Sequence, residues 1–348
     1  AGDGLEDANF ERSTANNAIL RLTTEEDWYE KVLHGTGKDE VPKREGAAAT
    51  QTEAAAFFDA VFEARMDVAV RETRRRYEGM LFREALQTGF YALQIARDAY
   101  RDGCDKLGVP LRTSTVRRFI EVQVALLAPI TPHFCEHVWR NILKRDGSVR
   151  AGSWPTGVSE EPSAEQTELL ERAEYLDKCI RTWRLALIKR AQPKKGKKGA
   201  AAAPVAPATR ATIYTSRNFP RWKEVVIAFV RGLYDASPDH SFPADAHKQL
   251  KGHLEATLDA QSKKNTKAAM QFAAQLINVD VPKEGAAALS LGVPFDEQAV
   301  LTAHARYIAA ALDLEEVAVV DATDLSAVPA DAQRPAGNAV PGAPAMVA

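Results

Sequence analysis

The sequence predicts a mainly α protein, in which an antiparallel helical bundle is followed by a small α/β C-terminal domain. Apolar residues recur about every 3.6 positions through residues 53–145, the spacing of helices that bury one face. A basic, Ala/Pro-rich stretch at 191–208 interrupts this pattern, and two short β-branched runs follow among further helical stripes. At roughly 150 residues per domain, 348 residues correspond to two or three folded units.

Residues 1–45 are polar, with apolar side chains only at intervals. A helix is expected through Trp28, Tyr29 and Val32. Gly35 and Gly37 would end it, because glycine readily takes the left-handed conformation that stops helices.

Four apolar stripes define the bundle, and each covers one helix face. They run over residues 58–77, 82–100, 116–127 and 135–143, and glycines or prolines separate them: Gly103 and Pro110 before the third stripe, Pro129 and Pro132 before the fourth. Helices joined by such short links form antiparallel bundles. A fifth helix, from about 163 to 189, completes a bundle domain of residues 53–190.

After the bundle, residues 191–208 are expected to be a flexible basic linker, because Lys, Gly, Ala and Pro bury no core. Residues 209–325 are expected to form the α/β domain, with strands at 212–215 and 317–320. Its helices are expected at 220–234, 244–259, 263–278 and 299–311. Residues 326–348, rich in Ala, Pro and Val without periodicity, are expected to be a disordered tail.

The composition argues against a strongly basic nucleic-acid-binding protein and against a membrane-spanning one. The formal net charge of −2 means that any nucleic-acid contact must come from local patches. Three scattered cysteines indicate a reducing compartment. No apolar run approaches the ~18 residues of a membrane span. The chain begins without Met and shows no targeting segment, so we expect it to be a piece of a longer protein.

Two basic clusters are candidate phosphate contacts, because Arg and Lys neutralise phosphates without depending on base sequence. One is Arg71, Arg74 and Arg75 on the first bundle helix. Its alternative interpretation is a solvated face paired with Glu72 and Glu78. The other follows the bundle and consists of Lys189, Arg190, Lys194, Lys195, Lys197 and Lys198.

Signatures of catalysis or metal binding are weak. His133, Glu136 and His137 match the H-x-x-E-H pattern of a zinc site, but the motif is short and Cys135 lies on the apolar face, so structural roles are favoured. The segment from Gly35 to Lys38 lacks the upstream glycine and the Ser or Thr of a phosphate-binding loop. We assign no catalytic residue, no metal ligand and no cofactor to this chain.

Three parts of the chain carry a family resemblance: the bundle, residues 1–10 and the C-terminal domain. Residues 83–90 and 127–134, with Trp139 and Trp154-Pro155, resemble the anticodon-binding helical domain of class I aminoacyl-tRNA synthetases for leucine, isoleucine, valine and methionine. Residues 1–10 resemble the stretch after the second ATP signature of the leucyl enzymes. Residues 295–301, Tyr307 and residues 312–315 resemble the C-terminal extension of the eukaryotic cytosolic leucyl enzymes.

The resemblance, over about residues 1–325, implies a cytoplasmic ligase that attaches leucine to tRNA-Leu with ATP and Mg²⁺. It also implies that residues 1–45 are the end of the catalytic core with the stem-contact segment. The family's signatures His-Ile-Gly-His and Lys-Met-Ser-Lys-Ser are absent here. The chain alone is therefore expected to be inactive. The bundle would hold the tRNA body, and the extension would approach its elbow and long variable arm.

Alternatives stay open. The chain is either this C-terminal tRNA-binding portion or a stand-alone module for RNA binding or synthetase-complex scaffolding derived from it. Other synthetases or scaffold proteins are possible partners. An isoleucyl or valyl relative is disfavoured by the extension at 295–316.

Overall fold

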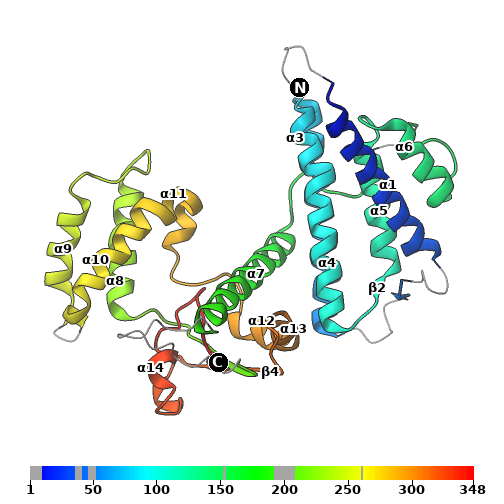
Figure 1. Cartoon of the computed structure of the whole chain (residues 1–348). Helices are drawn as coiled ribbons and strands as arrows, with labels where there is room; N and C mark the ends of the chain where they lie inside the picture. The colour runs from blue at the N-terminus through cyan, green and yellow to red at the C-terminus, as the bar shows by residue number, and fades with distance from the viewer. Residues whose placement is uncertain (1–9, 36–40, 46–51, 152–153, 192–207, 260–261) are drawn as a thin grey trace. The chain divides into compact units, whose positions relative to one another are not determined.

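The computed structural model describes residues 10–35, 41–45, 52–151, 154–191, 208–259 and 262–348, and it confirms the mainly helical fold class (Figure 1). The chain divides into two compact units, residues 1–174 and 175–348. The division falls inside one long helix, α7 (Ala164–Ala191), and not at the predicted linker. Residues 192–207 of that linker lie outside the described part of the chain.

The first unit is built from helices, and each of the four predicted stripes forms one. In chain order they are α1 (Arg12–His34), α2 (Glu53–Glu78), α3 (Phe82–Leu86) continued by η2 (Gln87–Ala92) and α4 (Leu93–Leu107), α5 (Thr113–Leu127), and α6 (Pro132–His137) continued by η3 (Val138–Ile142). The Thr52 hydroxyl accepts a hydrogen bond from the Ala55 N–H and caps α2. Pro132 lies in the first turn of α6, where its missing N–H costs nothing.

Large apolar side chains from these helices meet in one core. Tyr29 of α1, Phe62 and Met66 of α2, and Phe119 and Ile120 of α5 are each at most 1% exposed. A parallel pair that the sequence analysis did not predict, β1 (Lys43–Arg44) with β2 (Leu111–Arg112), lies beside them.

The predicted break at Gly103 is wrong, because α4 continues through it and ends at Gly108 in the left-handed conformation (φ 66°). Gly103 is inside the helix for a packing reason. A Cβ at this position would lie 2.8 Å from the Phe58 ring. Two helices therefore approach closely at a residue without a side chain.

This close approach predicts opposite effects for two glycine-to-alanine changes. Gly103→Ala should lower the free energy of unfolding by about 1–3 kcal/mol, because the new methyl group meets the Phe58 ring. Gly252→Ala should instead raise it by about 0.5–1 kcal/mol, because no atom lies within 4 Å of its Cβ position and alanine favours helix. Urea unfolding of both variants checks the pair. Equal effects of the same sign would contradict this packing.

The second unit combines a three-stranded sheet with helices, as expected for an α/β domain. The strands are β3 (Arg210–Thr215), β4 (Glu316–Asp321) and β5 (Ala345–Val347), in the order β4-β3-β5. β3 is parallel to β4, with Ile213 opposite Val319, and antiparallel to β5, with Ile213 opposite Met346.

Helices fill the chain between β3 and β4. They are α8 (Arg221–Ala236), α9 (Ala246–Thr257), η4 (Ser262–Asn265), α10 (Thr266–Gln275), η5 (Leu276–Asp280), α11 (Val281–Glu284), η6 (Gly285–Leu289), α12 (Glu297–Ala303) and α13 (Ala305–Ala311). α8, α9 and α10 share a core with Val226, Leu250, Leu254 and Ala269 fully buried. The single helix expected at 299–311 is divided at His304.

The prediction of a disordered tail at 326–348 is wrong. This segment forms η7 (Leu325–Ala327), α14 (Gln333–Ala336) and β5. Val328, Ala336 and Ala339 are buried in a cluster with Tyr214 and Ala322. In the sequence, the alanines and valines of this segment look like a low-complexity region. In the structure they complete a small core and one edge of the sheet.

Candidate nucleic-acid interface

The arginines of α2 are already engaged with oxygen acceptors. Arg74 Nε lies 2.9 Å from Glu78 Oε1. Arg75 lies 2.9 Å from Glu72 and 3.1 Å from Glu161. Arg71 donates a 3.0 Å hydrogen bond to the Gln166 side chain. These interactions agree with the alternative interpretation of Arg71, Arg74 and Arg75, in which they lie on a solvated helix face and pair with neighbouring side chains.

The basic residues at the end of α7 are in a different environment. Lys189 and Arg190 are exposed in the last described turn of α7, and positive charge is favourable near a helix C-terminus. Within the described ranges, neither side chain forms an ion pair with a carboxylate. Lys194, Lys195, Lys197 and Lys198 lie outside the described residues.

Trp183 does not contribute a stacking surface to this end of α7. Its side chain is only 4% exposed, so it belongs to the core of the second unit. A cavity of about 370 Å³ adjoins the same turns and is lined by Arg184, Arg190, Leu187, Ile188 and the chain at 311–314. Arg184 donates a 2.8 Å hydrogen bond to the Ala311 carbonyl. Cationic groups therefore border a partly apolar hollow here.

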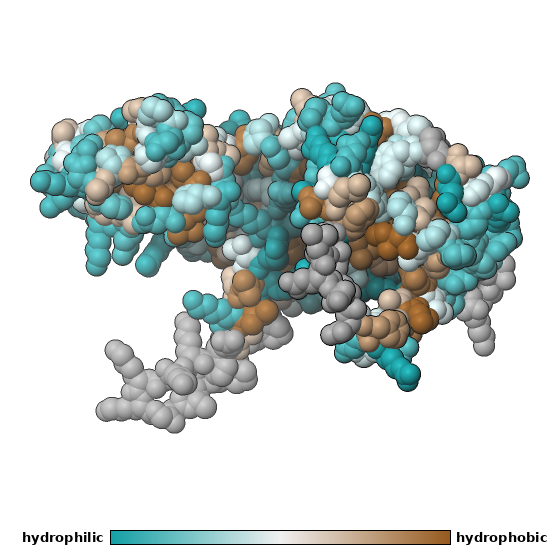
Figure 2. All heavy atoms as spheres, turned by 90° about the horizontal axis from the view of Figure 1, so that it is seen from above, coloured by the Kyte–Doolittle hydropathy of each residue, from teal (hydrophilic) through white to brown (hydrophobic). Residues whose placement is uncertain are grey.

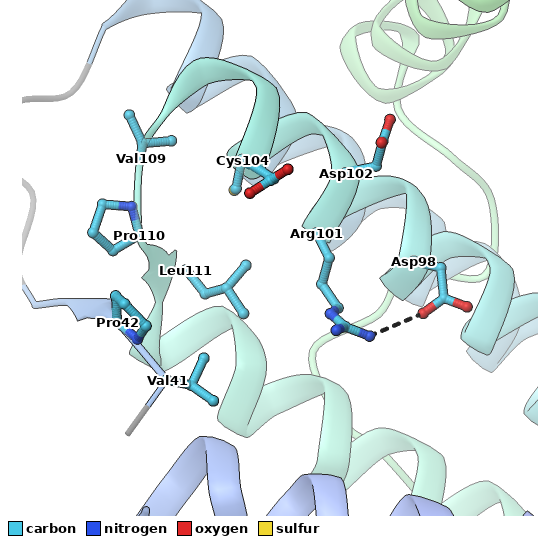
Figure 3. Close-up of a pocket in the computed structure, with 10 residues that line it drawn as sticks. Val41, Pro42, Asp98, Arg101, Asp102, Cys104, Val109, Pro110 and Leu111 are labelled. Carbon is cyan, nitrogen blue, oxygen red and sulfur yellow. Dashed lines mark ion pairs between the residues drawn. The ribbon is translucent and has the colours of Figure 1, made fainter. Parts of the chain in front are cut away.

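A larger cavity, of about 540 Å³, lies in the first unit beside α4 (Figure 3). Asp98, Arg101 and Asp102 approach it from α4, and the chain at 41–42 and 109–111 forms the opposite wall. Arg101 lies 3.5 Å from Asp98, and Asp105 adds a third carboxylate to the lining. The lining of this cavity holds three carboxylates and one guanidinium, so its net negative charge disfavours the binding of a phosphate.

Two side chains of the H-x-x-E-H motif, His137 and Glu136, have structural partners. His137 Nε2 lies 2.9 Å from Glu26 of α1. Glu136 accepts hydrogen bonds from the Ser148 hydroxyl and the Val149 N–H. These bonds lower the pKa of the Glu136 carboxyl, and the bond from Ser148 has the largest effect. In the part of the chain that the structure describes, no three His, Cys, Asp or Glu side chains converge as metal ligands would.

Hydrophilic side chains cover most of the face seen in Figure 2, with a few separate hydrophobic areas. Among the described residues, no helix combines the length and the apolarity that crossing a membrane requires.

Comparison with known proteins identifies the part of the chain from α2 to the end of the basic residues after α7. Residues 59–198 match the family described as the anticodon-binding domain of tRNA ligase. The match begins inside α2, continues through α7 and ends at Lys198, the last residue of the basic run that starts at Lys189.

The relatives that match nearly all of this chain are cytoplasmic leucine–tRNA ligases. The chain is 37% identical to that of Arabidopsis thaliana over 331 residues, which are 93% of this chain and 28% of the relative. It is 34% identical to that of Pongo abelii over 93% of this chain and 25% of the relative. It is 32% identical to that of Neurospora crassa over 92% of this chain and 26% of the relative. The chain thus spans about a quarter of the length of these relatives. It is a homologue of the C-terminal part of the cytoplasmic leucine–tRNA ligases, and it carries the anticodon-binding domain of tRNA ligases.

Proposed function

We propose that this chain is the tRNA-positioning portion of a cytoplasmic leucine–tRNA ligase. The observation that carries the proposal is the match to an anticodon-binding domain over residues 59–198, which includes the entire basic run. The whole enzyme attaches leucine to tRNA-Leu with ATP and Mg²⁺. This chain supplies none of the ATP signatures and acts by holding the tRNA body.

The basic residues at the end of α7 and just after it are the strongest candidates for RNA contact. Lys189, Arg190 and the four lysines at 194–198 neutralise phosphates and release condensed counterions, so their contribution is electrostatic and independent of base sequence. Arg71, Arg74 and Arg75 contribute less, because each must first give up an existing partner. The folded second unit contributes placement and shape, and with it the preference for a long variable arm.

Two exposed apolar side chains favour a second candidate function, the docking of another synthetase or a scaffold protein. Leu185 is 68% exposed and Ile188 is 51% exposed, one turn apart on α7. Phosphates gain nothing from such side chains, whereas protein interfaces bury them. A Leu185→Ser, Ile188→Ser variant separates the two functions, because it should lose a protein partner and keep its affinity for tRNA.

The purified 348-residue chain should bind tRNA-Leu but show no leucine-dependent pyrophosphate exchange. Binding should exceed that of a tRNA with a short variable arm, and it should weaken steeply with salt. A gel-shift titration over a salt series, beside an exchange assay with a heat-inactivated control, measures both. Leucine-dependent exchange above the control, or no shift of tRNA-Leu at low salt, would overturn the proposal.

A further inference from the structure

A buried carboxyl group in the second unit joins three segments that are far apart in sequence. Glu297 lies in the first turn of α12 and is only 8% exposed. The Tyr175 hydroxyl of α7 donates a hydrogen bond to its Oε1, and the Gly342 N–H, just before β5, donates another to its carboxyl. One side chain thus ties α7 and α12 to the C-terminal segment.

The titratable groups around Glu297 offer no positive charge to it. Tyr175 and Cys179 face it from α7, and Asp296 precedes it on α12. Arg217, in the loop after β3, lines a cavity of about 250 Å³ that Glu297 also borders, but its guanidinium lies 3.7 Å from Asp321. The segment at 339–347 has no titratable side chain. Within the described residues, no ion pair compensates a charge on Glu297.

Because the Glu297 carboxyl is buried with no cation beside it, its neutral, protonated form is favoured. Desolvation raises the pKa of Glu297 to about 7, against a smaller opposite effect of the hydrogen bonds from Tyr175 and Gly342. Burial also raises the pKa of Cys179 to about 12 and that of Tyr175 well above its ordinary range, so both stay neutral at physiological pH. Glu297 is then the group of this cluster that changes charge near pH 7.

The strand that Glu297 holds has a short main-chain ladder, although its neighbours pack in a small core. β5 pairs with only three residues of β3: Thr212, Ile213 and Tyr214. The chain enters β5 through a tight turn, with a bridge between Val340 and Ala343 and Gly342 in the left-handed region (φ 75°). A strand this short depends on the interactions that flank it, and the Gly342–Glu297 hydrogen bond is one of them.

We propose that Glu297 is a proton-controlled latch that holds β5 on the edge of β3. The protonated side chain still accepts hydrogen bonds from Tyr175 and Gly342, so it closes the latch without a buried charge. The ionised side chain favours an open state in which water reaches the carboxylate. Opening leaves one edge of β3 unpaired.

The sign of the pH dependence follows from the two pKa values. In the open state the carboxyl has its ordinary pKa of 4.5, and in the closed state its pKa is about 7. Closure is therefore fully favoured at acidic pH and weakens as the pH rises toward and through 7. With these values, the closing equilibrium is about tenfold weaker at pH 8 than at pH 6.

Hydrogen exchange of the full chain tests the latch. At pH 6 and pH 8, after correction for intrinsic exchange, the amides of Gly342 and residues 345–347 should lose about tenfold protection at the higher pH. The Glu297→Gln variant should keep the same protection at both values, because glutamine accepts the same bonds without a charge. Glu315→Gln, at an exposed position before β4, should behave as the unaltered chain.

A second variant keeps the test decisive if Glu297→Gln does not fold. Tyr175→Phe removes a bond that lowers the pKa of Glu297, so the midpoint of the protection loss should move to higher pH. Equal protection of these amides at pH 6 and pH 8 in the unaltered chain would overturn the proposal. A tenfold loss that persists in Glu297→Gln would also overturn it, because another group would then be titrating.

Discussion

Replacing Asp59 by alanine should destabilise the first unit by about 3–5 kcal/mol, because it leaves a buried guanidinium without its acid. Asp59, on α2, is 2% exposed, and Arg44, on β1, is 8% exposed. Arg44 Nη2 lies 2.6 Å from Asp59 Oδ1, and the Tyr100 hydroxyl donates to the same oxygen at 2.7 Å. The carboxylate thus attaches β1 to α2 and α4 together.

Urea unfolding at constant pH measures this effect. Asp27→Ala is the matched control, because Asp27 forms an ion pair with Lys31 in which the two side chains are 61% and 44% exposed. That exposed pair should contribute less than about 0.5 kcal/mol. Similar losses for the two variants would contradict a structural role for the buried pair.

Converting Lys189, Arg190, Lys194, Lys195, Lys197 and Lys198 to glutamine should weaken binding of every tRNA alike. At ~0.1 M salt the loss should be at least about tenfold, and the slope of log K against log salt should fall by about 0.7–0.9 for each phosphate that the variant no longer neutralises. Lys189 and Arg190 are free of carboxylate partners within the described residues, so their charges are available to phosphates. Fluorescence anisotropy of labelled tRNA over a salt series measures both quantities.

The control for this variant is the triple change of Arg71, Arg74 and Arg75 to glutamine. It should change the slope much less, because two of the three arginines already pair with Glu78, Glu72 and Glu161. A larger loss from this triple variant than from the six-residue variant would assign the RNA contact to α2 instead.

The sequence predicts those parts of the fold that depend on local periodicity. The helices of the bundle follow from apolar stripes, and the start of α6 follows from Pro132. The role of Gly103 is not predictable in this way, because it depends on Phe58, a residue of another helix. The division between the two units is not predictable from the sequence either, because α7 continues across Glu174 and Tyr175 without any compositional break.

The candidate site is predictable to a similar extent. Pairing of the α2 arginines with Glu72 and Glu78 follows from helical spacing, whereas Glu161 reaches Arg75 from 86 positions away. Glu297 gives no signal in the sequence, because an acid in the first turn of a helix ordinarily faces solvent. Its burial depends on Tyr175 and on a C-terminal segment whose composition suggests disorder.

Photo-crosslinking of thiouridine-labelled tRNA-Leu to the intact chain, with the modified peptides identified by mass spectrometry, tests the proposed RNA interface most directly. Contact through the basic run predicts that the adducts concentrate in peptides from residues 181–198 and disappear with excess unlabelled tRNA-Leu. Adducts that instead concentrate on α2 around Arg71 to Arg75, or that persist unchanged under this competition, would contradict the assignment of tRNA binding to the end of α7 and the residues that follow it.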